Sequence, residues 1–114
     1  EAAVSTTPGF FFVNVDYSML KVVTNDVVWV EGLKDYIKIH LASSSKPVIT
    51  RMSMKSVEVQ LAPPDFVRIH KSYIISVAYV TAIRKNSVFL GTMELPISEL
   101  YKDTVSLITG KHSS

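Results

Sequence analysis

Apolar and polar residues alternate along several short stretches of the chain, and this alternation predicts a protein built mainly from strands. Between residues 36 and 41, Ile37, Ile39 and Leu41 alternate with aromatic or polar side chains, the pattern of a strand with one buried face. Turn-forming Asn, Asp, Gly and Ser residues separate such stretches. Runs of β-branched and aromatic residues predict further strands at 10–15, 22–23, 27–30, 47–52, 66–70, 79–84, 88–90 and 93–95.

A helical pattern interrupts the strands once, in the middle of the chain. Ser53 is a suitable N-cap, and Met54, Val57 and Leu61 recur at helical spacing. Two prolines follow at 63–64, and proline ends helices because it disfavours helical backbone in the residue before it. The pattern therefore predicts a short helix that begins at residue 53 or 54 and ends at residue 61.

A second helical pattern closes the chain. Ser98 is a suitable N-cap, Glu99 and Asp103 suit the positive first turns, and Gly110 suits the C-terminal end. The residues expected to pack this helix on a sheet recur at helical spacing: Leu100, Tyr101, Thr104, Leu107 and Ile108.

Strands, a short helix, more strands and a terminal helix are typical of a mainly β, mostly antiparallel domain. The 114 residues are enough for one domain with a core of its own. Residues 1–9 are small and polar and predict a linker or disordered leader, residues 10–110 the domain, and residues 111–114 a disordered tail. Because the first residue is Glu, we expect the chain to be a piece of something longer.

Composition excludes several classes of protein. Apolar residues make up 47% of the chain and charged residues 19%, which is a globular composition. The absence of cysteine excludes disulfides, thiolate catalysis and cysteine-type zinc sites, and it fits a reducing compartment. No apolar run is long enough to cross a bilayer, and no signal peptide opens the chain. We therefore expect a cytoplasmic protein with no membrane partner.

The net charge of +2 is small, but its distribution is uneven. Residues 36–93 carry eight Lys or Arg against two acidic residues, a local charge of +6, whereas the two ends together carry −4. A basic middle is typical of a surface that contacts a polyanion. The alternative is a solvated surface whose charge happens to be uneven.

The stretch most informative about function is FVRIHKSYII, residues 66–75. Alternation places Val67 and Ile69 on one face of a strand and Phe66, Arg68 and His70 on the other. Lys71, Ser72 and Tyr73 follow where the strand is expected to end. Cationic and hydroxyl side chains at the tip of a strand suit a groove lined with phosphates and base edges better than an apolar pocket.

Catalysis has little support in the sequence. No His lies at metal-ligand spacing from a second His or carboxylate, and no nucleotide-binding or hydrolase motif occurs. Asp26, Glu31 and Asp35 are interpreted as turn and surface carboxylates. Ser72 and His70 are two residues apart on a strand end, which does not indicate a nucleophile and its base. We expect no enzymatic activity, no metal and no cofactor.

Residues 66–75 resemble the signature of the LytTR DNA-binding domain of bacterial response regulators (the LytR/AlgR family). Three other segments resemble further parts of that domain, in the same order. VVWVEGLKDYIKI (27–39) is similar to its early paired strands and first recognition loop, MSMKSV (52–57) to its short helix, and LPISELYK (95–102) to its closing strand-to-helix turn. The resemblance covers residues 10–109.

The resemblance implies a fold of several small antiparallel sheets with a short middle helix and a C-terminal helix. It also implies that loops rather than a recognition helix contact DNA. Three elements are then expected at the DNA: the segment Lys34-Asp35-Tyr36, the strand end with Arg68, His70 and Lys71, and the turn Ser98-Glu99.

Each residue of these elements has an expected role. Arg68 is expected to grip a phosphate or a guanine edge, and His70 and Lys71 to donate to purine N7 or O6. Lys34 and Lys38 are expected to neutralise phosphates, which sets affinity rather than sequence choice. Further cations that extend this track are Arg51, Arg84 and Lys85.

Two positions depart from the family pattern. Glu99 stands where the family often has Arg, which puts a base contact there in doubt and leaves Glu99 as a first-turn helix charge. Ser76 stands where Asn is common, and we interpret this as a difference in packing or turn structure.

Local structural roles are alternatives for several of the named residues. Tyr36 can instead cover the sheet, and His70 can bond locally to a backbone carbonyl. Ser72 and Tyr73 are expected to cap the turn and to pack beneath it, and Trp29 is expected in the core.

The sequence thus predicts a sequence-specific, double-stranded DNA-binding domain of a bacterial transcriptional regulator. By resemblance, its partners are promoter direct repeats, contacted in the major groove, a receiver domain of the same full-length protein, and a second copy that pairs with it on DNA. The competing hypothesis is a β-rich protein-interaction or ligand-binding module that uses its sheet edges.

Overall fold

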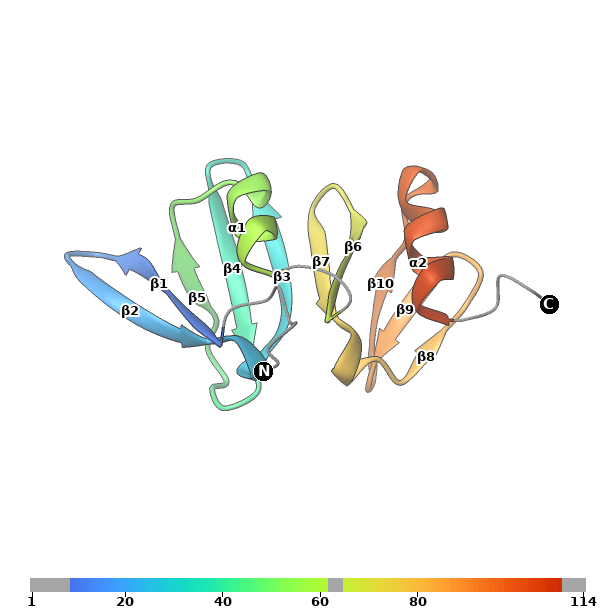
Figure 1. The fold of residues 1–114 in the computed structure, drawn as a ribbon, viewed down its shortest axis with the longest axis horizontal. Helices are drawn as coiled ribbons and strands as arrows, with labels where there is room; N and C mark the ends of the chain where they lie inside the picture. Colours follow the sequence, from blue (N-terminus) through green and yellow to red (C-terminus); the bar gives the residue numbers. More distant parts are fainter. Residues whose placement is uncertain (1–8, 62–64, 110–114) are drawn as a thin grey trace, which may run out of the picture.

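Three antiparallel sheets contain about half of residues 9–61 and 65–109, the part of the chain that the computed structural model describes (Figure 1). The first is a hairpin of β1 (Phe10–Val15) and β2 (Ser18–Val23). The central sheet has five strands in the order β5-β4-β3-β7-β6, and the third has the order β10-β9-β8. Their bounds are β3 Val27–Leu33, β4 Tyr36–Leu41, β5 Val48–Thr50, β6 Phe66–His70, β7 Tyr73–Ser76, β8 Ala82–Ile83, β9 Ser87–Leu90 and β10 Met93–Pro96.

The short middle helix, α1 (Met54–Gln60), forms where the sequence predicts it. The Ser53 hydroxyl accepts a hydrogen bond from the N–H of Ser56 at 3.0 Å, so Ser53 is the N-cap. Val57 and Leu61 are fully buried, and Met54 packs against the same core. The two prolines expected to end this helix lie outside the described residues.

The C-terminal helix forms in two parts, a 3₁₀ turn η3 (Glu99–Tyr101) and α2 (Lys102–Thr109). Ser98 precedes η3, but it caps only through its carbonyl, which accepts from the N–H of Tyr101 at 2.9 Å. Leu100 is 87% exposed, so the prediction that it packs on the sheet is wrong, because the 3₁₀ turn points it outward. Val105 is buried instead, and the side chains of Leu107 and Ile108 lie outside the described residues. No helix of the described part is both long and apolar enough to cross a membrane.

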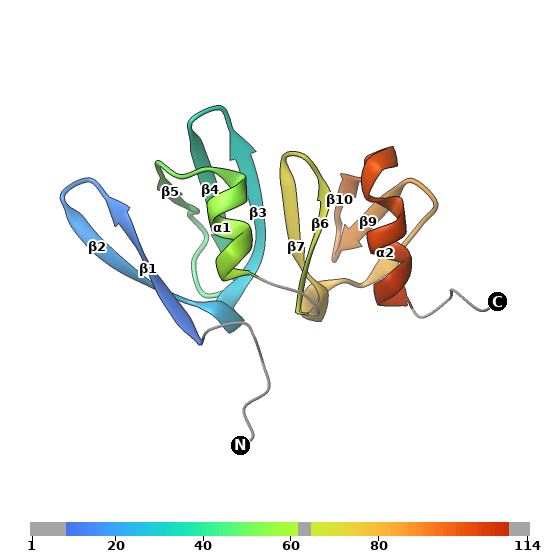
Figure 2. The ribbon, with the colours of Figure 1, turned by 45° about the horizontal axis from the view of Figure 1, so that its top comes forward.

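Both faces of the central sheet are covered, and each face contributes to a separate core. Along β7, Ile74 belongs to the first core and Ile75 to the second, and both are fully buried. The first core also contains buried residues of the hairpin, β3, β4 and α1, and the second contains buried residues of the third sheet and Val105 of α2. Figures 1 and 2 show α1 over one part of the molecule and α2 over the other.

The hairpin turns one apolar face inward and another to solvent. Phe11, Val13 and Val22 belong to the first core. On the opposite face Phe10 and Phe12 are each 51% exposed and contact each other edge to face, and Lys21 extends over the Phe10 ring. The apolar side chains exposed on this opposite face, which we call the outer face, are Phe10, Phe12, Met19 and Val23.

Strand prediction fails at three places. A strand was expected only at 22–23, whereas β2 begins at Ser18, because Ser18–Lys21 are all exposed and show no alternation in burial. β7 was not expected, since Tyr73–Ser76 has no apolar and polar alternation: it is buried on both faces. The predicted strand 79–84 is mostly absent; Val77–Tyr79 forms a 3₁₀ turn and only Ala82–Ile83 pairs. The predicted fold class, mainly β with several small antiparallel sheets and two helices, is confirmed.

Two loops of the central sheet lie at the same end. Figure 1 shows the β3–β4 loop and the β6–β7 loop at the top of the view, and the β4–β5 loop at the opposite end. The first two loops contain two of the three segments that the sequence singles out for function.

Candidate functional site

The β3–β4 and β6–β7 loops are held together by a backbone contact. The N–H of Gly32 donates to the carbonyl of Ser72 at 2.7 Å, and the adjacent pair Glu31 and Tyr73 is in register between β3 and β7. A Cβ added to Gly32 would lie 2.8 Å from Cγ of Met54, which is closer than two non-bonded carbon atoms normally come. Gly32 therefore allows α1 and both loops to meet at one point.

Side chains from both loops line one hollow on the surface. Lys34 and Lys71 are exposed, and Tyr36 is 44% exposed, with the Arg51 guanidinium 5.7 Å over its ring. The structure thus brings together the first two predicted elements. The residues that line the hollow are Gly32, Leu33, Lys34, Tyr36, Met54, Arg68, Lys71 and Ser72.

The third predicted element lies beside the second. The N–H of Ser98 donates to the carbonyl of Ile69 at 2.8 Å, which fixes the start of η3 against the end of β6. The Glu99 carboxylate is exposed and lies 3.3 Å from the Lys102 ammonium, as expected of a first-turn helix charge. Lys38 is half-buried opposite Glu31 in the β3–β4 ladder, and it does not line the hollow.

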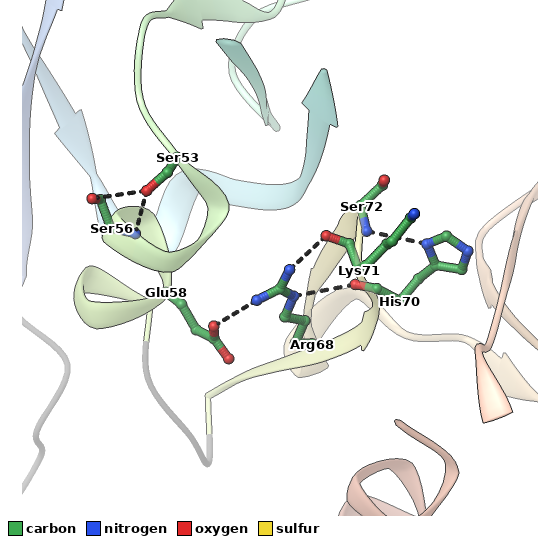
Figure 3. Close-up of polar contacts among 7 residues, drawn as sticks. All are labelled: Ser53, Ser56, Glu58, Arg68, His70, Lys71 and Ser72. Carbon is green, nitrogen blue, oxygen red and sulfur yellow. Dashed lines mark hydrogen bonds and ion pairs between the residues drawn. The ribbon is translucent and has the colours of Figure 1, made fainter. Parts of the chain in front are cut away.

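Arg68 and His70 do not share a face of β6, although alternation predicts that they do. The pairing of β6 with β7 shifts between Arg68 and His70, which is a β-bulge, so that His70 lies opposite Tyr73. The two rings contact each other with centroids 5.2 Å apart. Figure 3 shows the His70 ring extending away from the Arg68 guanidinium. The prediction is wrong because the bulge adds one residue and reverses the side-chain direction.

His70 makes one local hydrogen bond. Its Nδ1 accepts from the N–H of Ser72 at 3.1 Å (Figure 3), where a bond to a backbone carbonyl was the alternative considered. Because Nδ1 accepts, the proton of the neutral imidazole is on Nε2. His70 is half-exposed, so this Nε2–H is a donor near the surface.

The Arg68 side chain lines the hollow, but its guanidinium bonds to protein groups rather than extending into solvent. Nη1 donates to Oε1 of Glu58 at 3.0 Å, Nη2 to the carbonyl of Lys71 at 2.6 Å, and Nε to the carbonyl of His70 at 3.3 Å (Figure 3). The guanidinium also lies 5.6 Å over the Tyr101 ring of η3, and the side chain is only 18% exposed. The expectation that Arg68 protrudes from the strand tip is therefore not met.

Four residues that were expected to have structural roles rather than DNA contacts have such roles in the structure. Trp29 and Tyr73 pack against the second core, with ring centroids 5.8 Å apart. Ser72 fixes the turn through its backbone, and Ser76 is buried opposite Phe66.

Sequence reasoning missed two residues of the site, Gly32 and Glu58. Gly32 was interpreted only as a strand break, although a glycine within a β-branched run also signals close backbone approach. Glu58 was counted only as one of two acidic residues in a basic region, and that isolation was the available signal.

Comparison with known proteins identifies the family of this chain. Residues 17–109 match the family model of the LytTr DNA-binding domain. Over 62 residues the chain is 33% identical to the CO-responsive transcriptional regulator RcoM of Rhodospirillum rubrum, a match that covers 54% of this chain and 25% of that regulator. The chain thus spans about a quarter of the length of this curated relative.

A solved structure has the same fold. It is the LytTr DNA-binding domain of a Bacillus cereus protein described as a methyl-accepting/DNA response regulator, with a TM-score of 0.71 and 17% identity. The likeness covers 90% of this chain and 98% of that one. Since the family match extends over most of the chain, the chain belongs to the LytTR family of DNA-binding domains.

Proposed function

We propose that this domain binds double-stranded DNA sequence-specifically, with the β3–β4 loop, the β6–β7 loop and the start of η3 in the major groove. The observation that carries the proposal is the hollow between the first two loops, where Lys34, Tyr36 and Lys71 converge while Ser98 lies beside β6. An exposed cationic rim on a rigid sheet end suits the backbone and base edges of a duplex.

The side chains divide into two chemical roles. Lys34 and Lys38 carry charge to the phosphates, which sets affinity and its salt dependence. Lys71, which the sequence assigns to a base edge, is exposed on the same hollow and is proposed here to contact a phosphate as well. His70 offers the Nε2–H donor to an acceptor on a base edge, such as purine N7 or guanine O6. Tyr36 supplies a hydroxyl in the hollow and Ser98 one beside the end of β6, and each is proposed to donate to phosphate or to a base.

The wider context is proposed from the relatives. One relative is named as a transcriptional regulator and the other as a response regulator. We therefore propose a bacterial, cytoplasmic regulator in which a receiver domain elsewhere in the protein controls this domain, and in which two copies bind direct repeats.

Selection of bound sequences from a random duplex pool tests the proposal directly. The expected result is an enriched motif whose affinity falls steeply with salt. Replacing Lys34 and Lys71 together by alanine is expected to reduce the slope of log affinity against log salt by about two, since about one slope unit belongs to each phosphate contact.

Lys46→Ala provides a matched control. Lys46 is equally exposed but lies in the β4–β5 loop, at the opposite end of the sheet (Figure 1). Its removal is expected to leave the salt slope unchanged. Failure to enrich any duplex, or equal loss of slope in both proteins, would contradict the proposal and favour the interaction module instead.

A further inference from the structure

We infer that Arg68 and Glu58 form a clamp that positions the β6–β7 turn for DNA, and that Arg68 acts through this turn rather than by touching DNA itself. The inference rests on the proposed function of the turn. Its basis is one guanidinium that joins a carboxylate of α1 to two consecutive carbonyls of the turn, those of His70 and Lys71 (Figure 3).

The direction of the donors argues for positioning. All three nitrogens of Arg68 donate to protein groups, and its side chain is only 18% exposed. A planar guanidinium that binds two successive carbonyls fixes the peptide planes between them. The same turn then directs the Ser72 N–H toward His70 and leaves the Lys71 side chain in solvent.

Glu58 connects the β6–β7 turn to a well-anchored helix. Its carboxylate is on α1, a helix that Ser53 caps and that Val57 and Leu61 anchor in the first core. The ion pair with Arg68 at 3.0 Å thus ties the turn to a rigid element. The Arg68 guanidinium also lies over the Tyr101 ring, and this contact extends the tie to η3, next to Ser98.

The sign of the Glu58→Ala effect separates the clamp from simple electrostatics. Removing a carboxylate near a polyanion should strengthen binding, whereas loss of the clamp should weaken binding to the selected duplex by about tenfold. Glu94→Ala is the matched control, because Glu94 is an exposed carboxylate on β10 of the third sheet. It is expected to leave affinity unchanged or slightly higher.

Arg68→Lys separates positioning from a direct phosphate contact, and the Glu58→Ala effect separates it from a direct guanine contact, which needs no carboxylate at position 58. Lysine satisfies a phosphate as a point charge, but it cannot bind two carbonyls and a carboxylate in the fork geometry of arginine. The clamp predicts that Arg68→Lys loses specific affinity like Glu58→Ala, with no change in salt slope. The double variant is expected to lose no more than either single variant, since both remove one interaction.

Amide hydrogen exchange of the protein without DNA provides an independent measurement. The Ser72 and Gly32 N–H groups should exchange faster in Arg68→Lys and Glu58→Ala, while core amides of β3 and β4 keep their protection. The clamp would be overturned if Arg68→Lys kept both the wild-type amide exchange rates and the wild-type affinity. Tighter DNA binding by Glu58→Ala would also overturn it. If the wild-type protein selects no duplex, the proposed function fails, while the exchange data still decide whether the pair holds the turn.

Discussion

His70 shows how one local bond decides what a side chain offers to a partner. Its Nδ1 accepts from the Ser72 N–H, which leaves Nε2–H as the donor in the neutral ring. A donor fits the acceptor edges of guanine, of adenine at N7 or of thymine at O4, but not the amino group of cytosine. In the proposed complex, a backbone amide two residues away would therefore set which base edges His70 can contact.

His70→Ala is expected to weaken binding to the selected duplex by about 1–3 kcal/mol, because it removes this donor. His70→Asn is the informative comparison, since the Asn oxygen can accept from Ser72 while its shorter side-chain amide N–H groups do not reach the position of Nε2–H. Titration of both proteins with the selected duplex, beside thermal melts, measures the effect. If His70→Asn binds like the wild type, or if melting collapses in both, the donor role is wrong.

Gly32→Ala is expected to destabilise the domain by about 1–3 kcal/mol, because the added methyl would overlap Met54 at 2.8 Å. Chemical denaturation measures the loss. On a Met54→Ala background the same change should cost much less, as the space is then open. Equal costs on both backgrounds would show that Met54 is not the obstacle.

At the scale of elements, β3 and β4 are joined by a stack of Trp29 on His40. The ring centroids are 4.0 Å apart and the planes differ by 3°. Nε2 of His40 is buried and lies 3.7 Å from Oε1 of Glu31, too far for a hydrogen bond. Burial therefore outweighs the attraction of the Glu31 carboxylate and lowers the pKa of His40 below its ordinary value of 6.5.

This lowered pKa makes stability depend on pH in a definite direction. Since the unfolded chain binds the His40 proton more readily than the folded one, the contribution is complete above about pH 6.5 and is lost as the pH falls below it. Thermal melts between pH 8 and pH 5.5 should show a larger fall for the wild type than for His40→Phe, which keeps a ring on Trp29 but cannot be protonated. Parallel curves would contradict this assignment.

Elements were predictable where their pattern was local. The β4 alternation and the Ser53 cap each depend on residues within one element, and both are confirmed. β7 was missed because burial on both faces removes alternation, and the bulge before His70 was missed because it arises from pairing with β7. The inward direction of Arg68 depends on Glu58, ten residues away on another element, which no pattern along β6 reveals.

At the scale of the whole molecule, the family and fold followed from four ordered segments, and the structure adds how they meet. Lys71 follows Lys34 and Tyr36 by more than thirty positions in sequence, yet all three line one hollow because β3 pairs with β7 in the central sheet. Their DNA contacts remain a prediction.

The outer face of the hairpin gives a prediction for the molecule in solution. Four exposed apolar side chains on a two-stranded sheet favour self-association at high concentration. Phe12→Thr with Met19→Thr should lower the apparent mass at high concentration in sedimentation experiments, with little change in melting temperature. Unchanged self-association would show that another surface is responsible.

The outer face of the hairpin and the cationic hollow are formed by different residues. The outer face of the hairpin is directed away from the first core, whereas the cationic hollow lies between the β3–β4 and β6–β7 loops. Substitutions confined to the outer face are therefore expected to change self-association without altering the residues that line the hollow.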